Sequence, residues 1–264
     1  MKQHKIAKTI WKSLIAIFLL APLVVTFIYS FSERWIYIIP EGFTIKYYLQ
    51  TLTNKQFLLG IVRGLIISVI PVIITNVCVL LALYVVIVYV PHMEKVVQIL
   101  CLIPSTVNGI ILATSILATY SGGNTIFANR IVMLAMIYCV FVMPMTYQGI
   151  RNSLYSVNTK GILEAAEMLG CRKFRGYITI VIPSVMHGLF NSALMCLSGL
   201  FGDFAIIKII ASSQYETAQS YLYRNRHTDT QALSAAVVIL LLITLSINYV
   251  VHKSQNKKHE RRSA

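Results

Sequence analysis

Long apolar stretches separated by shorter polar ones run through this sequence of 264 residues. Six of the stretches are nearly free of charge, and each is close to the about 20 residues that a helix needs to cross a bilayer. They predict spans at about 13–31, 64–89, 96–120, 131–150, 184–210 and 232–251. Because the stretches are continuously apolar rather than alternating, they favour helices over the strands of a β-barrel. We therefore expect an all-α integral membrane protein, with a single transmembrane domain over residues 1–264.

A polar loop at 152–183 separates the fourth and fifth predicted spans. Its apolar residues recur at uneven helical spacing, with lysine, arginine and glutamate residues between them. Gly170 lies where a first helix should end, because glycine readily adopts the left-handed conformation of a helix cap. Pro183 marks the start of the next apolar run. The loop therefore predicts a helix, a glycine turn, a second short helix and a return to the membrane.

The composition supports the membrane interpretation. The chain is 57% hydrophobic and 12% charged, whereas soluble domains carry about 25% charged residues. The net charge of +14 would suit a nucleic-acid ligand, but the basic residues gather at the two termini and in the polar loop, as orientation signals do. We therefore expect no nucleic-acid partner. Some attraction of the basic C-terminal tail to anionic membrane lipid is expected.

Six spans would place both termini, the short turn before Lys95 and the polar loop on one side of the membrane. That side carries four basic residues in the N-terminal segment, Lys95, five from Arg151 to Arg175 and five in the tail, which is 15 of the 23. The other side carries the remaining 8 over longer segments. Because basic loops stay in the cytoplasm, both termini and the polar loop are predicted to be cytoplasmic.

The residues give no sign of catalysis. The sequence contains no GxxxxGK[ST] phosphate loop, no HExxH and no GxSxG, so we expect no enzyme activity and no ATP hydrolysis by this chain. None of the five cysteines has a metal-ligand spacing, so neither a metal nor a cofactor is expected. The energy for transport would then come from a partner or from an ion gradient. Asp203 is the only acidic residue within a predicted span, which weakens a gradient-driven mechanism without excluding it.

Candidate pathway residues are the polar groups inside the predicted spans. Asn76, Asn108 and Asn191 could line a solute pathway, or could simply hydrogen-bond neighbouring helices. Asp203 could line the pathway, pair with Lys208 or cap a helix end. The sequence leaves these alternatives open. Kinked or broken helices are suggested by prolines in three consecutive spans, Pro71, Pro104 and Pro144.

The polar loop also carries a motif. Glu164-Ala165-Ala166, three residues, Gly170, nine residues and Ile180-x-Ile182-Pro183 resembles the EAA loop of permeases from binding-protein-dependent ABC importers, although the family usually has leucine where Ile182 stands. Two shorter segments, PEGFTIKYY from Pro40 to Tyr48 and Gly202-Asp203-Phe204, are similar to segments of the same family.

This resemblance implies a function. In the family, the loop is a cytoplasmic coupling helix that docks on a separate ATP-binding subunit, and the matching positions are Glu164, Ala165, Ala166 and Gly170. Ile180 and Pro183 would position the second helix of the loop. A second permease subunit, identical or related, would complete the pathway in the bacterial inner membrane, and an extracytoplasmic binding protein would deliver the solute.

The substrate is less clear. The stretch from Gly202 to Ala235 is most similar to permeases for ferric iron, thiamine, 2-aminoethylphosphonate and polyamines, which suggests a small polar or charged solute. The alternatives are a gradient-driven secondary transporter and a membrane scaffold that does not transport. An intramembrane enzyme would need a cluster of His, Asp or Ser that the sequence lacks.

Overall fold

A computed structural model describes residues 2–34, 41–122, 126–211 and 214–263. The described chain is mostly helical and has two short antiparallel strands, in which Ser32 pairs with Phe43 and Arg34 with Glu41. The elements, in chain order, are α1 (Lys2–Phe31), β1 (Ser32–Arg34), β2 (Glu41–Phe43), α2 (Lys46–Thr53), α3 (Lys55–Val88), η1 (Pro91–Met93), α4 (Glu94–Leu102), η2 (Ile103–Thr106), α5 (Gly109–Tyr120), η3 (Ile126–Ala128), α6 (Arg130–Ser156), α7 (Thr159–Met168), α8 (Lys173–Gly176), the π-helical η4 (Tyr177–Val181), α9 (Ile182–Phe201), α10 (Ala205–Ala211), α11 (Ala218–Arg224) and α12 (Thr230–Ser263).

Among the described residues, five helices are long and apolar enough to cross a membrane: Leu14–Phe31, Lys55–Val88, Arg130–Ser156, Lys173–Phe201 and Thr230–Tyr249. A sixth crossing is formed if the bent pair Pro91–Thr106 and Gly109–Tyr120 is a single span. The predicted helical membrane fold is confirmed. Pro40, the first residue of the PEGFTIKYY segment, lies outside the described residues.

Contacts divide the chain into two compact units, Met1–Leu59 with Tyr221–Ile243, and Gly60–Ser220 with Thr244–Ala264. In the first unit, Asn54 begins α3 by accepting hydrogen bonds at its side-chain oxygen from the backbone N–H groups of Gln56 and Phe57. The amide nitrogen of Asn54 donates to the hydroxyl of Tyr221, at 2.9 Å. One polar side chain thereby caps a long helix and ties it to α11.

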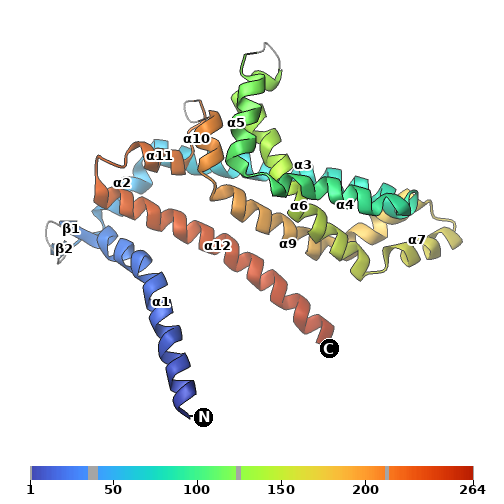
Figure 1. The fold of residues 1–264 in the computed structure, drawn as a ribbon, viewed down its shortest axis with the longest axis horizontal. Helices are drawn as coiled ribbons and strands as arrows, with labels where there is room; N and C mark the ends of the chain where they lie inside the picture. The colour runs from blue at the N-terminus through green and yellow to red at the C-terminus, as the bar shows by residue number, and fades with distance from the viewer. Residues whose placement is uncertain (1, 35–40, 123–125, 212–213, 264) are drawn as a thin grey trace. The chain divides into compact units, whose positions relative to one another are not determined.

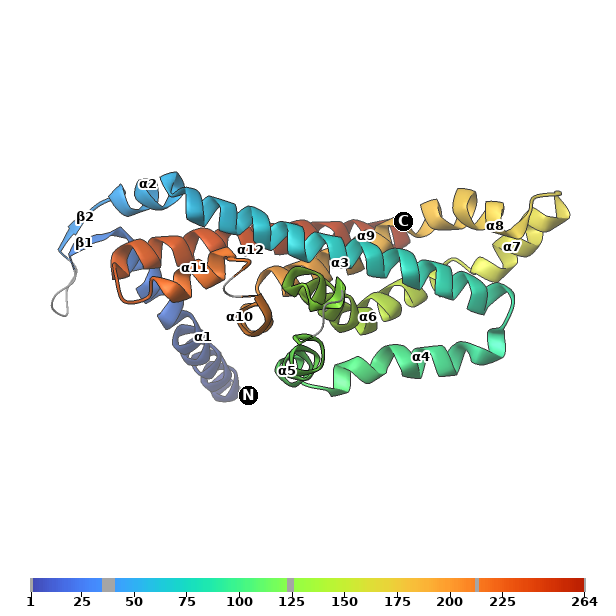
Figure 2. The same ribbon diagram turned by 90° about the horizontal axis from the view of Figure 1, so that it is seen from above.

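The second unit contains the polar loop and is built on α3, α6 and α9 (Figure 1, Figure 2). Helices α6 and α9 make the most extensive contact between two elements of the described chain, and α3 joins them through shared apolar clusters. Its buried side chains form two apolar clusters, one around Tyr138 and Leu134 and one around Tyr147 and Tyr177. The second cluster joins the ends of α3 and α6 to α7 and η4, so it fixes the base of the polar loop.

Helices α6 and α9 approach closely because small residues face one another across their contact. A Cβ atom on Gly149 would lie 2.5 Å from the Cβ of Ser192, and one on Gly188 would collide with the hydroxyl of Ser153. Small residues spaced four apart allow two helix backbones to pack tightly within a membrane. This contact fixes the direction in which α6 leads into α7.

Gly60 gives a direct test of the packing in the second unit. A Cβ atom at Gly60 would lie 2.7 Å from the backbone nitrogen of Ala218, and backbone atoms cannot move aside as a side chain can. Gly60→Ala is therefore expected to lower the free energy of unfolding by about 1–3 kcal/mol, measured by thermal unfolding of the purified protein. Gly199→Ala is the matched control, because no other element of the described chain comes within 4 Å of its Cβ position. An equal effect of both changes would contradict the packing described here.

The third predicted span is not one helix. Helices α4 and α5 meet at 91°, and Val107 between them is extended. Figure 1 shows α5 standing upright from α4, and Figure 2 shows α5 nearly end-on. Pro104 lies just before the bend, whereas α3 and α6 continue through Pro71 and Pro144. Of the three prolines expected to break or kink a span, only Pro104 lies at an interruption of its helix.

The fifth predicted span also differs from the helix observed. It starts earlier, at Lys173, and stops at Phe201 instead of 210. The start corrects the expectation that a second short helix precedes a return to the membrane at Pro183, since the helix runs through that proline without a break. The π-helical turn η4 explains this, because the Ile182 N–H bonds to the Tyr177 carbonyl five residues back. The wider turn makes room for a proline ring that would otherwise clash with a carbonyl four residues earlier.

Candidate functional site

Helix α7 ends in a turn that depends on glycine. Gly170 has a φ of +82°, the left-handed conformation expected from the sequence. The Cys171 N–H donates to the Ala166 carbonyl and the Gly170 N–H to the Glu167 carbonyl, both at 2.9 Å. These two bonds make a Schellman motif, which satisfies the last carbonyl groups of the helix. The turn reverses the chain, so α8 returns beside α7.

One face of α7 is buried against α8 and η4. Leu163 and Ala166 are 3% and 5% exposed, and a Cβ atom on Gly176 would lie 3.4 Å from the Cβ of Ala166. Tyr177 is buried beneath them and donates from its hydroxyl to the Leu80 carbonyl on α3, at 3.0 Å. The α7–α8 pair is therefore a firmly anchored hairpin.

The opposite face of α7 is exposed to solvent, and we call it the open face. Its exposed residues are Glu164, Ala165, Glu167, Met168 and Leu169. Met168 is 89% exposed and Leu169 is 88% exposed, the highest values among the large apolar side chains that the structure describes. Two apolar side chains so fully presented at a helix end form a small apolar tip beside charged groups, which is typical of a contact surface for another protein.

The motif residues divide between the two faces. Glu164 and Ala165 lie on the open face, but Ala166 lies on the buried face and holds the hairpin together. The prediction that Ala166 itself belongs to the contact surface is therefore not supported by its position. Met168 and Leu169 are among the unevenly spaced apolar residues of the loop, and that spacing alone does not predict their exposure. Helical phase counted from Leu163 would have found it, because Met168 falls about 140° away at 100° per residue.

Ile180 and Pro183 lie further along, on the continuous helix Lys173–Phe201, and both are exposed. The packing of that helix on the hairpin comes instead from Gly176, Tyr177 and Val181, which are buried. An aromatic contact adds to it, since the Tyr84 ring of α3 lies 4.9 Å from Tyr177 and 5.4 Å from Phe174, between ring centroids.

The hairpin carries two ion pairs on its open side. Lys160 and Glu164 are 3.9 Å apart within α7, and Lys173 of α8 is 3.2 Å from Glu167. Both pairs are well exposed, so each contributes little to stability. Their charges remain available to a partner protein.

The pathway candidates occupy three different environments. Asn108 caps α5, where its side-chain oxygen accepts from the Ile110 N–H at 2.9 Å. Asn76 donates to the Val72 carbonyl on its own helix. The side-chain oxygens of Asn76 and Asn191 are buried and have no hydrogen-bond partner among the described residues. Asn108 therefore caps a helix, whereas Asn76 and Asn191 each keep a buried side-chain oxygen without a partner among the described residues.

Asp203 lies at the interruption between α9 and α10. The Tyr138 hydroxyl of α6 donates to its carboxylate at 2.7 Å, and the backbone groups at the start of α10 also bond to it. The ammonium of Lys208 lies over the Phe204 ring, at 5.6 Å from the centroid. Of the alternatives left open by the sequence, the cap on a helix end agrees best with this geometry.

The second unit thus combines helices that are long and apolar enough to cross a membrane with an anchored hairpin that leaves one face of α7 exposed. Residues 92–258 match the family model described as a binding-protein-dependent transport system inner membrane component. The chain belongs to this family.

Two solved structures share the fold. One is the MetNI methionine ABC transporter in inward-facing conformations, with a TM-score of 0.60 and 16% identity over 74% of this chain and 92% of that chain. The other is a bacterial ABC transporter involved in the import of the acidic polysaccharide alginate, with a TM-score of 0.71 and 14% identity over 96% of each chain. No curated protein matches the sequence.

Family membership settles the general function. The chain is a membrane-embedded permease subunit of a binding-protein-dependent ABC importer and not an enzyme, because ATP is hydrolysed by a separate subunit in this family. An ATP-binding subunit and a substrate-binding protein are its implied partners, and the inner membrane is its implied location. The alternatives of a gradient-driven transporter and of a scaffold that does not transport are therefore set aside.

Proposed function

We propose that the open face of α7 is the surface on which the ATP-binding subunit docks, and that this contact drives the permease. The exposure of Met168 and Leu169 beside Glu164 and Ala165 is the observation that carries the proposal. The buried face of α7 packs against α3 in the second apolar cluster. A force applied to the open face is therefore expected to move the α7–α8 hairpin as a rigid unit. ATP binding and hydrolysis in the partner would shift the permease between two global states in this way.

Reversing the charge of Glu164 tests the docking surface. In Glu164→Arg, a long cationic side chain replaces an exposed carboxylate, so the tagged permease is expected to lose most of the ATP-binding subunit that co-purifies with the wild type. The bound proteins are identified by mass spectrometry from mild detergent. Glu33→Arg is the control, because it makes the same change in the other unit. Full retention of the subunit by Glu164→Arg, or an equal loss in Glu33→Arg, would count against the proposal.

The membrane topology depends on whether the bent α4–α5 pair is one crossing. Six crossings would put both termini and α7 on the same side of the membrane, and the distribution of basic residues favours the cytoplasmic side. At either terminus, a fused reporter that is active only in the cytoplasm is then expected to be active, and a reporter that is active only outside it is expected to be inactive. A re-entrant α4–α5 pair would leave five crossings and put the termini on opposite sides, which the same fusions would reveal.

We propose that a second permease subunit, identical or related, completes the pathway, and that Asn76 and Asn191 lie along it. The substrate proposal remains a small polar or charged solute of the iron, thiamine, 2-aminoethylphosphonate or polyamine class. It is supported by the similarity of the stretch from Gly202 to Ala235, which includes α11. Thermal-shift screening of the cognate binding protein against these four classes tests it, and stabilisation by none of them would exclude it.

A further inference from the structure

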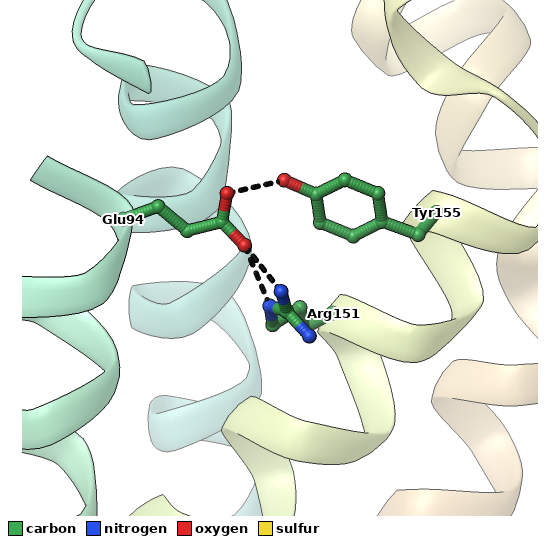
Figure 3. A network of polar contacts seen from close by, with 3 residues as sticks. All are labelled: Glu94, Arg151 and Tyr155. Carbon is green, nitrogen blue, oxygen red and sulfur yellow. Dashed lines mark hydrogen bonds and ion pairs between the residues drawn. The ribbon is translucent and has the colours of Figure 1, made fainter. Parts of the chain in front are cut away.

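A polar cluster outside the docking surface joins α4 to α6. Glu94, the first residue of α4, accepts at one carboxylate oxygen from the Arg151 guanidinium, with Nε at 2.7 Å and Nη2 also in contact. Its other oxygen accepts from the Tyr155 hydroxyl at 2.6 Å. Figure 3 shows the three side chains converging between the two helices. The Arg151 guanidinium also lies over the Tyr155 ring, at 4.8 Å from the centroid, which holds the two α6 residues in register.

The cluster lies between the hairpin and the bend of the third span. Tyr155 is one residue from the end of α6, and α7 begins at Thr159 after a short turn. Asn158 in that turn has a φ of +50°, and the Thr159 hydroxyl donates back to the Leu154 carbonyl at 2.7 Å, so the turn is tightly defined. On the other side, Glu94 begins the short helix that ends at the 91° bend before α5.

Helix α4 is already held against α6 by apolar contacts, so the charged contact is not needed to pack it. Val97 and Cys101 already pack α4 against the second apolar cluster. The side chains of Arg151 and Glu94 keep 31% and 22% of their surface exposed, and partly solvated pairs contribute modestly to stability. The ion pair instead fixes the orientation of α4 relative to α6, because an arginine with two contacts to one carboxylate constrains direction as well as distance.

We infer that Glu94, Arg151 and Tyr155 are positioning residues for transport, which tie the first turn of α4 to the end of α6 so that a displacement of α7 reaches the α4–α5 bend. The inference rests on the proposed docking of the ATP-binding subunit at α7. Helix α9 receives the same displacement directly through α8 and η4. The cluster connects α4, the first part of the broken third span, to the end of α6. Displacement of α7 therefore moves both α9 and the α4–α5 pair.

Two native cysteines report on two separate events, the docking of the ATP-binding subunit at α7 and the resulting displacement of α4. Cys101 lies on α4 and Cys171 in the turn between α7 and α8, and both are half-buried free thiols. The purified permease alone is compared with the intact importer, which adds the ATP-binding subunit and the binding protein. The importer is measured without nucleotide and trapped with ATP and vanadate. Brief N-ethylmaleimide labelling followed by peptide mass spectrometry measures each thiol. In the wild type, docking protects Cys171, and trapping changes the labelling rate of Cys101 by about threefold or more.

The variants separate the linkage from the docking. Glu94→Gln and Glu94→Ala are expected to abolish most of the change at Cys101 while Cys171 stays protected. Exchanging the charges in Glu94→Arg with Arg151→Glu should restore it. Lys95→Gln is the matched control, because Lys95 is exposed on the same helical turn.

Three results would overturn the inference. A wild-type response of Cys101 in both Glu94 variants would show that α4 needs no such link. Loss of Cys171 protection in those variants would mean that the cluster only supports the docking surface. If Cys171 is not protected in the wild type, both the docking proposal and the inference that rests on it are wrong. This outcome is seen with the wild-type protein, before any variant is made.

Discussion

Replacing Met168 and Leu169 together with glutamate is expected to weaken binding of the ATP-binding subunit by about 100-fold or more. Each side chain is almost fully exposed in this chain, and burying one apolar side chain of this size in a partner contributes about 1.5–3 kcal/mol. Two together give at least about 3 kcal/mol, and every 1.4 kcal/mol is about tenfold in affinity. The glutamates would also be costly to bury.

The measurement is a binding titration of the purified ATP-binding subunit on permease in nanodiscs. Because both side chains are exposed, the thermal stability of the permease alone should not change. Ile126→Glu is the matched control, since Ile126 is 79% exposed and lies outside the hairpin. An affinity within about threefold of the wild type would show that the apolar tip of α7 does not contact the subunit.

Asp203→Ala is expected to destabilise the permease by about 1.5–5 kcal/mol. The change removes the side-chain cap of α10, and caps contribute about 0.5–2 kcal/mol. It also leaves the Tyr138 hydroxyl, on a fully buried side chain, without the acceptor it has in the wild type, which costs about 1–3 kcal/mol. Thermal unfolding of the purified permease measures the sum.

Two further variants isolate the contribution of Tyr138. Asp229→Ala removes a comparable cap, since Asp229 accepts from the Ala232 N–H at the start of α12, but it leaves no buried hydroxyl unpaired. It should cost about 1 kcal/mol. In a double-mutant cycle, Tyr138→Phe should recover part of the Asp203→Ala loss. Loss of transport by Asp203→Ala with unchanged stability would instead place Asp203 in the pathway.

Continuous apolar runs were sufficient to predict the membrane helices, because backbone groups in lipid must bond within their own helix. They did not predict where two of these helices stop. Pro104 interrupts its helix and Pro71 does not, although both stand in apolar runs. The two prolines differ in their neighbours, because Asn108 stands four residues after Pro104 and its side chain caps a new helix. Asp203 does the same after α9. A capping residue inside an apolar run was the missing signal.

The candidate site was predictable in sequence position but not in orientation. The motif located the hairpin, and Gly170 had the expected conformation. Which residues of α7 face outward depends on how α8 returns against it, and that is set by the close contact of Gly176 with Ala166. The Glu94 cluster could not be predicted at all, because it joins residues 57 and 61 positions apart through the path of the chain.

Contact between the open face of α7 and the ATP-binding subunit is tested most directly by photo-crosslinking in native membranes. Benzoylphenylalanine is placed at Ala165, with Gly122 as the control position because no atom of the described residues lies within 4 Å of a Cβ added there. We predict one dominant product from position 165, in which mass spectrometry finds a soluble protein with a phosphate-binding loop, and no such product from position 122. Crosslinking from position 165 only to lipid or to proteins without that loop would contradict the proposed docking.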